Sequence, residues 1–230
     1  MADEAIVLAG GFGTRLRSVV GEVPKPLAPV AGRPFLAWLL DRLAEAGMTH
    51  VVLATGYLAE QVESTLGEEW KGMALSHSVE PEPLGTGGAI TLARARLRGT
   101  AAHVLNGDTW LRYSPAALAA LVQAHGAGIG VALAQVPEVG RYGSVRLEGE
   151  RILGFDEKGG SGPGHINAGC YYLAPDVLAG LPGGRYSFET DILAPLAAAG
   201  RIVGLKGGEG FIDIGVPEDY ARAQILFGAG

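Results

Sequence analysis

The sequence predicts an α/β fold in which a mixed, mainly parallel sheet is flanked by helices. In the first half, short apolar runs alternate with helix-length amphipathic segments, a rhythm typical of parallel strands joined by right-handed helical crossovers. From Gly128 onward, apolar runs follow one another with brief connections, which indicates antiparallel additions to the sheet. With 48% hydrophobic and 18% charged residues, the chain can bury a full core.

The first half is expected to contain four strands and four helices. The strands are expected at 5–9, 50–56, 74–79 and 102–108, and the helices at 34–47, 57–67, 86–97 and 114–126. Pro34 suits the start of its helix and Gly47 the stop. Ser114 is expected to cap the fourth helix, with Pro115 in its first position.

The second half is expected to continue with strands and to close with two helices. Strands are expected at 128–136, 144–149, 151–158, 166–174, 201–207 and 210–215, and helices at 187–200 and from Pro217. Ser187 is expected to cap the first of these helices. No linker separates the two halves, so we expect one domain over 1–230, divided into parts of about 1–112 and 113–230.

Charge and cysteine content exclude several classes of protein. The net charge of −6 argues against a nucleic-acid-binding protein, which usually carries a basic face. Cys170 is the only cysteine, so an intrachain disulfide and a cysteine metal cluster are excluded. The N-terminus does not resemble a secretion signal, and no apolar run approaches the ~20 residues that span a bilayer. We therefore expect a cytoplasmic protein without membrane contact.

A glycine-rich, cationic segment follows the first strand, in "AIVLAGGFGTRLRSVVGEVPKPLAPVAGRP". Gly10, Gly11 and Gly13 lie just past that strand, where open parallel sheets bind ligands. Exposed N–H groups of such a turn form a cradle for anions. Arg15 adds positive charge, and Lys25 is held between two prolines that restrict its backbone. This combination predicts a polyphosphate site.

Three other interpretations of the segment compete with a polyphosphate site. The P-loop pattern G-x-x-x-x-G-K-[ST] is absent. The dinucleotide pattern G-x-G-x-x-G fits Gly11 and Gly13, but Leu16 replaces its third glycine, which disfavours a dinucleotide-dependent oxidoreductase. A flexible glycine turn with surface cations remains the simplest alternative.

The segment "LAGGFGTRLR…VPKPLAPVAGRP" closely resembles the signature of sugar-1-phosphate nucleotidyltransferases, and later motifs match in order. These are "EPLGTGGAI", "LNGD", "FDEK", "INAGCYYL" and "FIDIG", so that the resemblance covers essentially the whole chain. Among these enzymes, the chain looks most like the D-glycero-D-manno-heptose 1-phosphate guanylyltransferases. The resemblance implies a Rossmann-like, GT-A-like nucleotide-diphospho-sugar transferase fold, with the nucleotide in the first half and the sugar in the second.

The implied reaction is attack by a sugar-phosphate oxygen on the α-phosphorus of a nucleoside triphosphate. The nucleophile is already an anion, so catalysis should consist of positioning and charge neutralisation. Arg15 suits the leaving phosphates, Lys25 can lie between the reacting phosphates, and Lys158 resembles the family lysine that holds the sugar phosphate. Asp108 and Asp213 are expected to bind Mg²⁺ as cofactor, although each could instead cap a turn.

The resemblance also implies nucleotide-binding residues, which are Leu8, Ala9, Gly10, Gly11, Gly13, Thr14, Glu80, Pro83, Gly85, Thr86 and Gly87. An ionised Glu80 only accepts hydrogen bonds, and guanine offers two adjacent donors, so Glu80 favours guanine unless it lies in a solvated loop. The stretch from Gly85 to Gly88 could offer N–H groups to the base or ribose.

The implied sugar-binding residues are Tyr142, Gly143, Glu157 and Asn167. Asn167 could instead satisfy a turn, and Tyr142 could serve only packing. We expect transfer of a guanylyl group from GTP to the heptose 1-phosphate. Mannose, glucose or N-acetylmuramate phosphate with UTP or dTTP, or a catalytically silent nucleotide-sugar sensor, are the alternatives. The sequence leaves open whether the protein forms a homo-oligomer.

Overall fold

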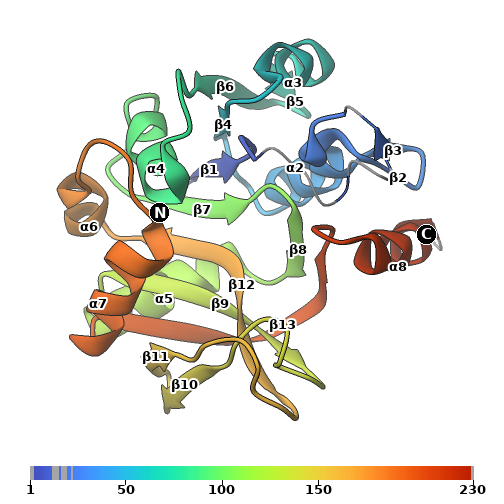
Figure 1. Cartoon of the computed structure of the whole chain (residues 1–230). Helices are drawn as coiled ribbons and strands as arrows, with labels where there is room; N and C mark the ends of the chain where they lie inside the picture. Colours follow the sequence, from blue (N-terminus) through green and yellow to red (C-terminus); the bar gives the residue numbers. More distant parts are fainter. Residues whose placement is uncertain (1–2, 12–15, 17–19, 22, 229–230) are drawn as a thin grey trace.

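A mixed sheet of eleven strands forms the centre of the molecule (Figure 1). The computed structural model describes residues 3–11, 16, 20–21 and 23–228. The strands of the sheet are β1 (Glu4–Leu8), β4 (His50–Thr55), β5 (Glu69–Trp70), β6 (Met73–Val79), β7 (Ala102–Asn106), β8 (Thr109–Arg112), β9 (Ile129–Val136), β10 (Val145–Glu148), β11 (Arg151–Phe155), β12 (Gly164–Leu173) and β13 (Ile202–Asp213). Their order is β10-β11-β13-β9-β12-β7-β1-β4-β6-β5, and β8 pairs with β13 beside this path.

Helical segments and one small hairpin complete the described part of the chain. The α-helices are α2 (Phe35–Glu45), α3 (Ala59–Leu66), α4 (Gly85–Arg94), α5 (Pro115–His125), α6 (Pro175–Gly180), α7 (Ala194–Ala198) and α8 (Pro217–Gly228). A 3₁₀ turn η1 (Lys25–Leu27), a π-helical turn η2 (Glu189–Leu193) and the hairpin β2 (Pro29–Val30) and β3 (Arg33–Pro34) are the remaining elements. None of these helices is long and apolar enough to cross a bilayer.

Strand direction places several strand ends at one edge of the sheet. β1 pairs in parallel with both β4 and β7, and β4 pairs in parallel with β6. The carboxyl ends of these four strands therefore lie together. β12 runs antiparallel between β7 and β9, and so joins the parallel strands of the first half to the strands of the second.

Helices cover both faces of the sheet because the strand side chains alternate between two apolar clusters. In β1, Ala5 and Val7 belong to one cluster, which includes residues of α2, α3, α5 and α8. Ile6 belongs to the other, which includes residues of α4, α6 and α7. The predicted class, a mixed α/β sheet flanked by helices, is confirmed.

Local signals placed several helix ends correctly. Ser114 caps α5, since its hydroxyl accepts a hydrogen bond from the N–H of Ala117 at 3.2 Å, and Pro115 occupies the first turn. Gly47 follows α2 with φ +83°, a left-handed conformation that glycine adopts without strain. Ser187 accepts a hydrogen bond from the N–H of Thr190, as expected of a cap.

One expectation about strands was wrong, one expected helix is confirmed with an altered first turn, and short elements such as β8 were not predicted. The two short strands expected at 201–207 and 210–215 form one strand, β13, with an irregularity between Leu205 and Gly208. The expected helix 187–200 begins with the π-helical turn η2 and continues as α7. Pro195 has no N–H to donate and clashes with the carbonyl one turn earlier, and the wider π turn relieves this conflict. β8 was not predicted, because its four residues are too short to show a period.

His103 in β7 is a buried titratable group. It is 1% exposed, and its ring lies 5.1 Å from the ring of Tyr172. Burial disfavours the charged form and lowers the pKa of His103 to about 4. In the unfolded chain this histidine has an ordinary pKa of ~6.5. Between that pH and about 4, the unfolded chain therefore binds a proton at His103 and the native protein does not.

We predict that His103→Leu makes stability less dependent on pH. As the pH falls below ~6.5, protonation of the unfolded wild type lowers its free energy of unfolding, and the loss from this group reaches about 2 kcal/mol at pH ~5. Urea unfolding at neutral pH and at pH ~5 should show a smaller loss in the variant. His125→Leu is the control, because His125 is partly exposed and bonded to Glu150. Equal losses in wild type and His103→Leu would refute the assignment.

Candidate functional site

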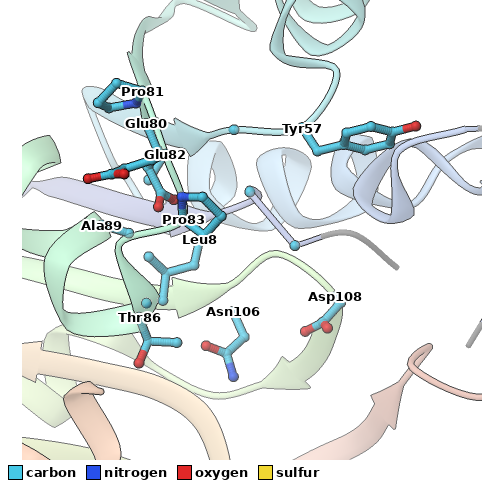
Figure 2. Close-up of a pocket in the computed structure, with 15 residues that line it drawn as sticks. Leu8, Tyr57, Glu80, Pro81, Glu82, Pro83, Thr86, Ala89, Asn106 and Asp108 are labelled. Atoms are coloured by element: carbon cyan, nitrogen blue, oxygen red, sulfur yellow. The ribbon is translucent and has the colours of Figure 1, made fainter. Parts of the chain in front are cut away.

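A cavity of about 540 Å³ opens at the carboxyl ends of the parallel strands (Figure 2). Its walls come from the ends of β1, β4 and β7, the loop after β6 and the first turns of α4. The lining residues are Leu8, Gly10, Gly11, Ala54, Gly56, Tyr57, Glu80, Pro81, Glu82, Pro83, Gly85, Thr86, Ala89, Asn106 and Asp108. We call it the first cavity.

Most of the residues expected to bind the nucleotide lie around the first cavity. They are Leu8, Gly10, Gly11, Glu80, Pro83, Gly85 and Thr86. Ala9 does not line it, because Ala9 is 2% exposed and its N–H donates to the carbonyl of Ala54. Gly13, Thr14 and Arg15 lie outside the described residues. The roles of all these residues in binding stay predictions.

Glu80 approaches the glycine turn closely. Its Oε2 accepts a hydrogen bond from the N–H of Leu84 at 2.8 Å, and a Cβ added to Gly10 would lie 2.8 Å from Oε1. A larger residue at position 10 would require the Glu80 carboxylate to shift. Burial raises the pKa of Glu80 above its ordinary value. Figure 2 shows Glu80 across the cavity from Asn106 and Asp108, with Leu8 between them.

Gly87 packs against a tyrosine and does not line the cavity. Its N–H donates to the carbonyl of Tyr186 at 3.1 Å, and an added Cβ would overlap the Tyr186 ring. The Tyr186 hydroxyl is held in turn by Thr91 at 2.7 Å. The Gly87 N–H therefore already has a protein partner, and a role of Gly87 in nucleotide binding stays a prediction.

Lys25, Asp108 and Asp213 form a charged cluster beside the first cavity. The Lys25 ammonium forms a short ion pair with Asp108 and lies 3.8 Å from Asp213 Oδ1. The pairing of β13 with β8 sets Asp213 opposite Thr109, which brings the two carboxylates together. Burial, and then the nearby charge of Asp108, raise the pKa of Asp213.

A second cavity, of about 250 Å³, contains all the residues expected to bind the sugar. They are Tyr142, Gly143, Glu157 and Asn167, together with Lys158. Gly143 has φ +83°, and an added Cβ would overlap the Asp156 carbonyl. Asn167 lies inside β12 and not in a turn. Its Oδ1 accepts a hydrogen bond from the N–H of Gly169 and its Nδ2 donates to the Tyr171 hydroxyl, at an irregularity of the strand.

Sequence reasoning missed several lining residues. Asn106 was read only as part of a strand, although it ends β7 and lines the first cavity. Glu189 lies in the expected helix 187–200 and was not named as a site residue, but it lines the second cavity. Ala54, Gly56, Tyr57 and Ala89 carry no sequence signal of a site. The position of Asn106 directly before the "GD" of "LNGD" was the one available hint.

We predict that Gly87→Ala destabilises the protein by about 1–3 kcal/mol, because the methyl group overpacks against the Tyr186 ring. Urea unfolding measures the loss. Gly183→Ala is the matched control, since a Cβ there meets no neighbour within 4 Å. If the ring is the cause, adding Gly87→Ala to a Tyr186→Ala background should cost much less than in wild type. An equal cost in both backgrounds would contradict this explanation.

Comparison with known proteins identifies the family. Residues 4–227 match the family model described as "Nucleotidyl transferase". A D-glycero-alpha-D-manno-heptose 1-phosphate guanylyltransferase of Aneurinibacillus thermoaerophilus is 38% identical, with 96% of each chain covered. A mannose-1-phosphate guanylyltransferase of Mycobacterium tuberculosis is 39% identical, and the match covers 96% of this chain but 63% of that protein. The crystal structure of HddC from Yersinia pseudotuberculosis complexed with GMP-PN is 33% identical, with 97% of this chain and 99% of that chain covered and a TM-score of 0.85. The fold and family expected from the motifs are confirmed, and the chain belongs to the nucleotidyl transferase family.

Proposed function

We propose that the protein transfers the guanylyl group of GTP to D-glycero-D-manno-heptose 1-phosphate, releasing pyrophosphate and forming the GDP-sugar. The observation that carries this proposal is the pair of cavities whose walls are joined by a hydrogen bond. The first lies beside the glycine turn and the Lys25 cluster, and the second holds Lys158 among carboxylates. A hydrogen bond of 2.6 Å joins Thr86 of the first to Glu189 of the second. Relatives named for this activity match nearly the full chain.

In this reaction a phosphate oxygen of the sugar phosphate forms a bond to the α-phosphorus of GTP, and the bond to the leaving pyrophosphate breaks. The attacking oxygen is already anionic, so no side chain needs to remove a proton. The protein's contribution is to bring two anions together and neutralise their charge. Lys25 would lie between the reacting phosphates and Lys158 would hold the sugar phosphate. Arg15, outside the described residues, would bind the leaving phosphates.

Asp108 and Asp213 would hold the Mg²⁺ ion. Both carboxylates lie beside the single ammonium of Lys25, so they converge on one point of positive charge. A pair of carboxylates completed by phosphate oxygens suits Mg²⁺, and the donor set therefore fits the ion. When bound, Mg²⁺ supplies Lewis-acid stabilisation of phosphate charge. The Lys25 ammonium lies between the two carboxylates and offsets their mutual repulsion.

Glu80 would select the base. One of its oxygens already accepts the N–H of Leu84, and the other oxygen remains for a guanine donor. Uracil and thymine present a single donor flanked by carbonyls, which a carboxylate would repel. The HddC structure, a complex with GMP-PN, supports a guanine nucleotide for this chain as well.

A mannose 1-phosphate guanylyltransferase is the second candidate, favoured by the 39% identical relative of that name. The decisive measurement is pyrophosphate release with GTP, UTP and dTTP, each combined with heptose, mannose, glucose and N-acetylmuramate 1-phosphates. Fastest turnover of GTP with the heptose phosphate is expected. A faster mannose reaction would favour the second candidate, and no release with any pair would favour a nucleotide-sugar sensor.

We predict that Asp108→Asn and Asp213→Asn each lower kcat by a factor of about 100 or more, because a neutral amide binds Mg²⁺ poorly. Pyrophosphate release at limiting Mg²⁺ measures this loss, and a chelator should silence the wild type. Asp176→Asn, at a surface ion pair with Arg201, is the control. Unchanged kcat in either variant at limiting Mg²⁺ would remove that aspartate from the metal site.

We predict that Glu80→Gln narrows the preference for GTP over UTP. The amide presents a donor to one guanine donor, a mismatch that costs ~1–3 kcal/mol, so the ratio of kcat/KM values should fall by about one to two powers of ten. Both nucleotides are measured with one common sugar phosphate. Glu82→Gln, in the same loop, is the comparison variant. An unchanged ratio in Glu80→Gln would show that Glu80 does not choose the base.

A further inference from the structure

Glu189 connects the two cavities through a closed set of hydrogen bonds. Thr86, at the start of α4, donates its hydroxyl to Glu189 Oε2 at 2.6 Å. The same hydroxyl accepts a hydrogen bond from the N–H of Phe188 at 2.9 Å, and Ser187 donates a second bond to Glu189 Oε2 at 3.1 Å. Thr86, which lines the first cavity, is thus hydrogen-bonded directly to Glu189, which lines the second.

The carboxylate of Glu189 is held by one oxygen. Among the described residues both hydrogen bonds fall on Oε2, so that Oε1 is the oxygen available to a ligand in the second cavity. Asp156 and Glu157 also line this cavity, and Lys158 is the basic side chain among its lining residues. Asp156 is already bonded to Ser144 and Arg146. Lys158 suits the phosphate of a sugar phosphate, and the Glu157 and Glu189 carboxylates suit its hydroxyl groups, which donate hydrogen bonds.

The π-helical turn η2 fixes where this carboxylate lies. Glu189 begins the turn, and its carbonyl accepts the N–H of Ala194, five residues later. Single π turns are frequent at functional sites, because they displace a side chain from its ordinary helical position. The neighbouring Tyr186 is docked on Gly87, so the segment that carries Glu189 is attached to α4 at two points.

We propose that Glu189 determines sugar specificity by accepting a hydrogen bond from a sugar hydroxyl through Oε1, while Thr86 of the nucleotide cavity positions it through Oε2. This inference rests on the proposed sugar phosphate substrate. It has a consequence for Thr86, which would affect sugar affinity although it lines the other cavity. Occupation of the first cavity would then influence binding in the second through one shared carboxylate.

The test compares the best sugar 1-phosphate of the wild type with its monodeoxy analogues, at saturating GTP. A charge-assisted hydrogen bond to one hydroxyl should make the wild type discriminate against one analogue by roughly 10- to 100-fold in kcat/KM. Glu189→Ala should abolish that discrimination and leave the penalties for the other analogues unchanged. Glu189→Gln keeps an acceptor for Thr86 and should reduce the discrimination by at least about threefold.

Two further variants distinguish a direct contact between Glu189 and the sugar from a general disturbance of the segment that carries Glu189. Thr86→Val should raise the KM for the sugar phosphate by roughly three- to tenfold. Asp191→Asn is the control, because Asp191 accepts a hydrogen bond from the N–H of Ser187 in the same segment but does not line either cavity. It should preserve the pattern of penalties. Wild-type turnover with the same penalties in both Glu189 variants would overturn this inference alone. Absence of turnover with every sugar phosphate would overturn the proposed function, and this inference with it.

Discussion

The attraction between the Lys25 ammonium and the carboxylates of Asp108 and Asp213 unites three segments that are distant in sequence. Without the ammonium, two partly buried carboxylates would repel each other, and burial already raises the pKa of Asp213. Neighbouring elements hold the three charged side chains in place. η1 fixes Lys25 between prolines, and the β8–β13 pairing holds the aspartates at one edge. The first cavity opens beside this cluster, since Asp108 also lines the cavity.

The sequence allowed prediction of the class of fold, of eight of the fifteen residues that line the first cavity and of five of the thirteen that line the second. Many of the predicted residues lie at or just after the ends of strands. A glycine turn after the first parallel strand, and polar groups at later strand ends, must gather at one edge. The sequence could not show that β8 exists, since four residues have no period, nor that β13 is continuous. Both depend on pairing between distant segments. Tertiary pairing thus explains why Asp108 and Asp213 could be named separately but not shown to be adjacent.

Two glycines show that membership of a sequence motif does not fix the role of each residue in it. Gly10 leaves room for the Glu80 carboxylate in the first cavity. Gly87, in the stretch expected to face a nucleotide, leaves room for Tyr186 instead. A Cβ at either position would displace a neighbouring side chain, but that neighbour lies in the first cavity at Gly10 and in the segment before η2 at Gly87. Sequence alone cannot separate these cases, because the partner of each glycine comes from another part of the chain.

The antiparallel strand β12, hydrogen-bonded to β7 on one side and to β9 on the other, limits how the molecule can move. A hinge between the two halves would have to shear these ladders and expose their buried N–H and carbonyl groups to apolar surroundings, which is costly. Rigid-body closure of one half over the other would therefore carry this cost, whereas movement of loops at the edge of the sheet would leave the ladders intact.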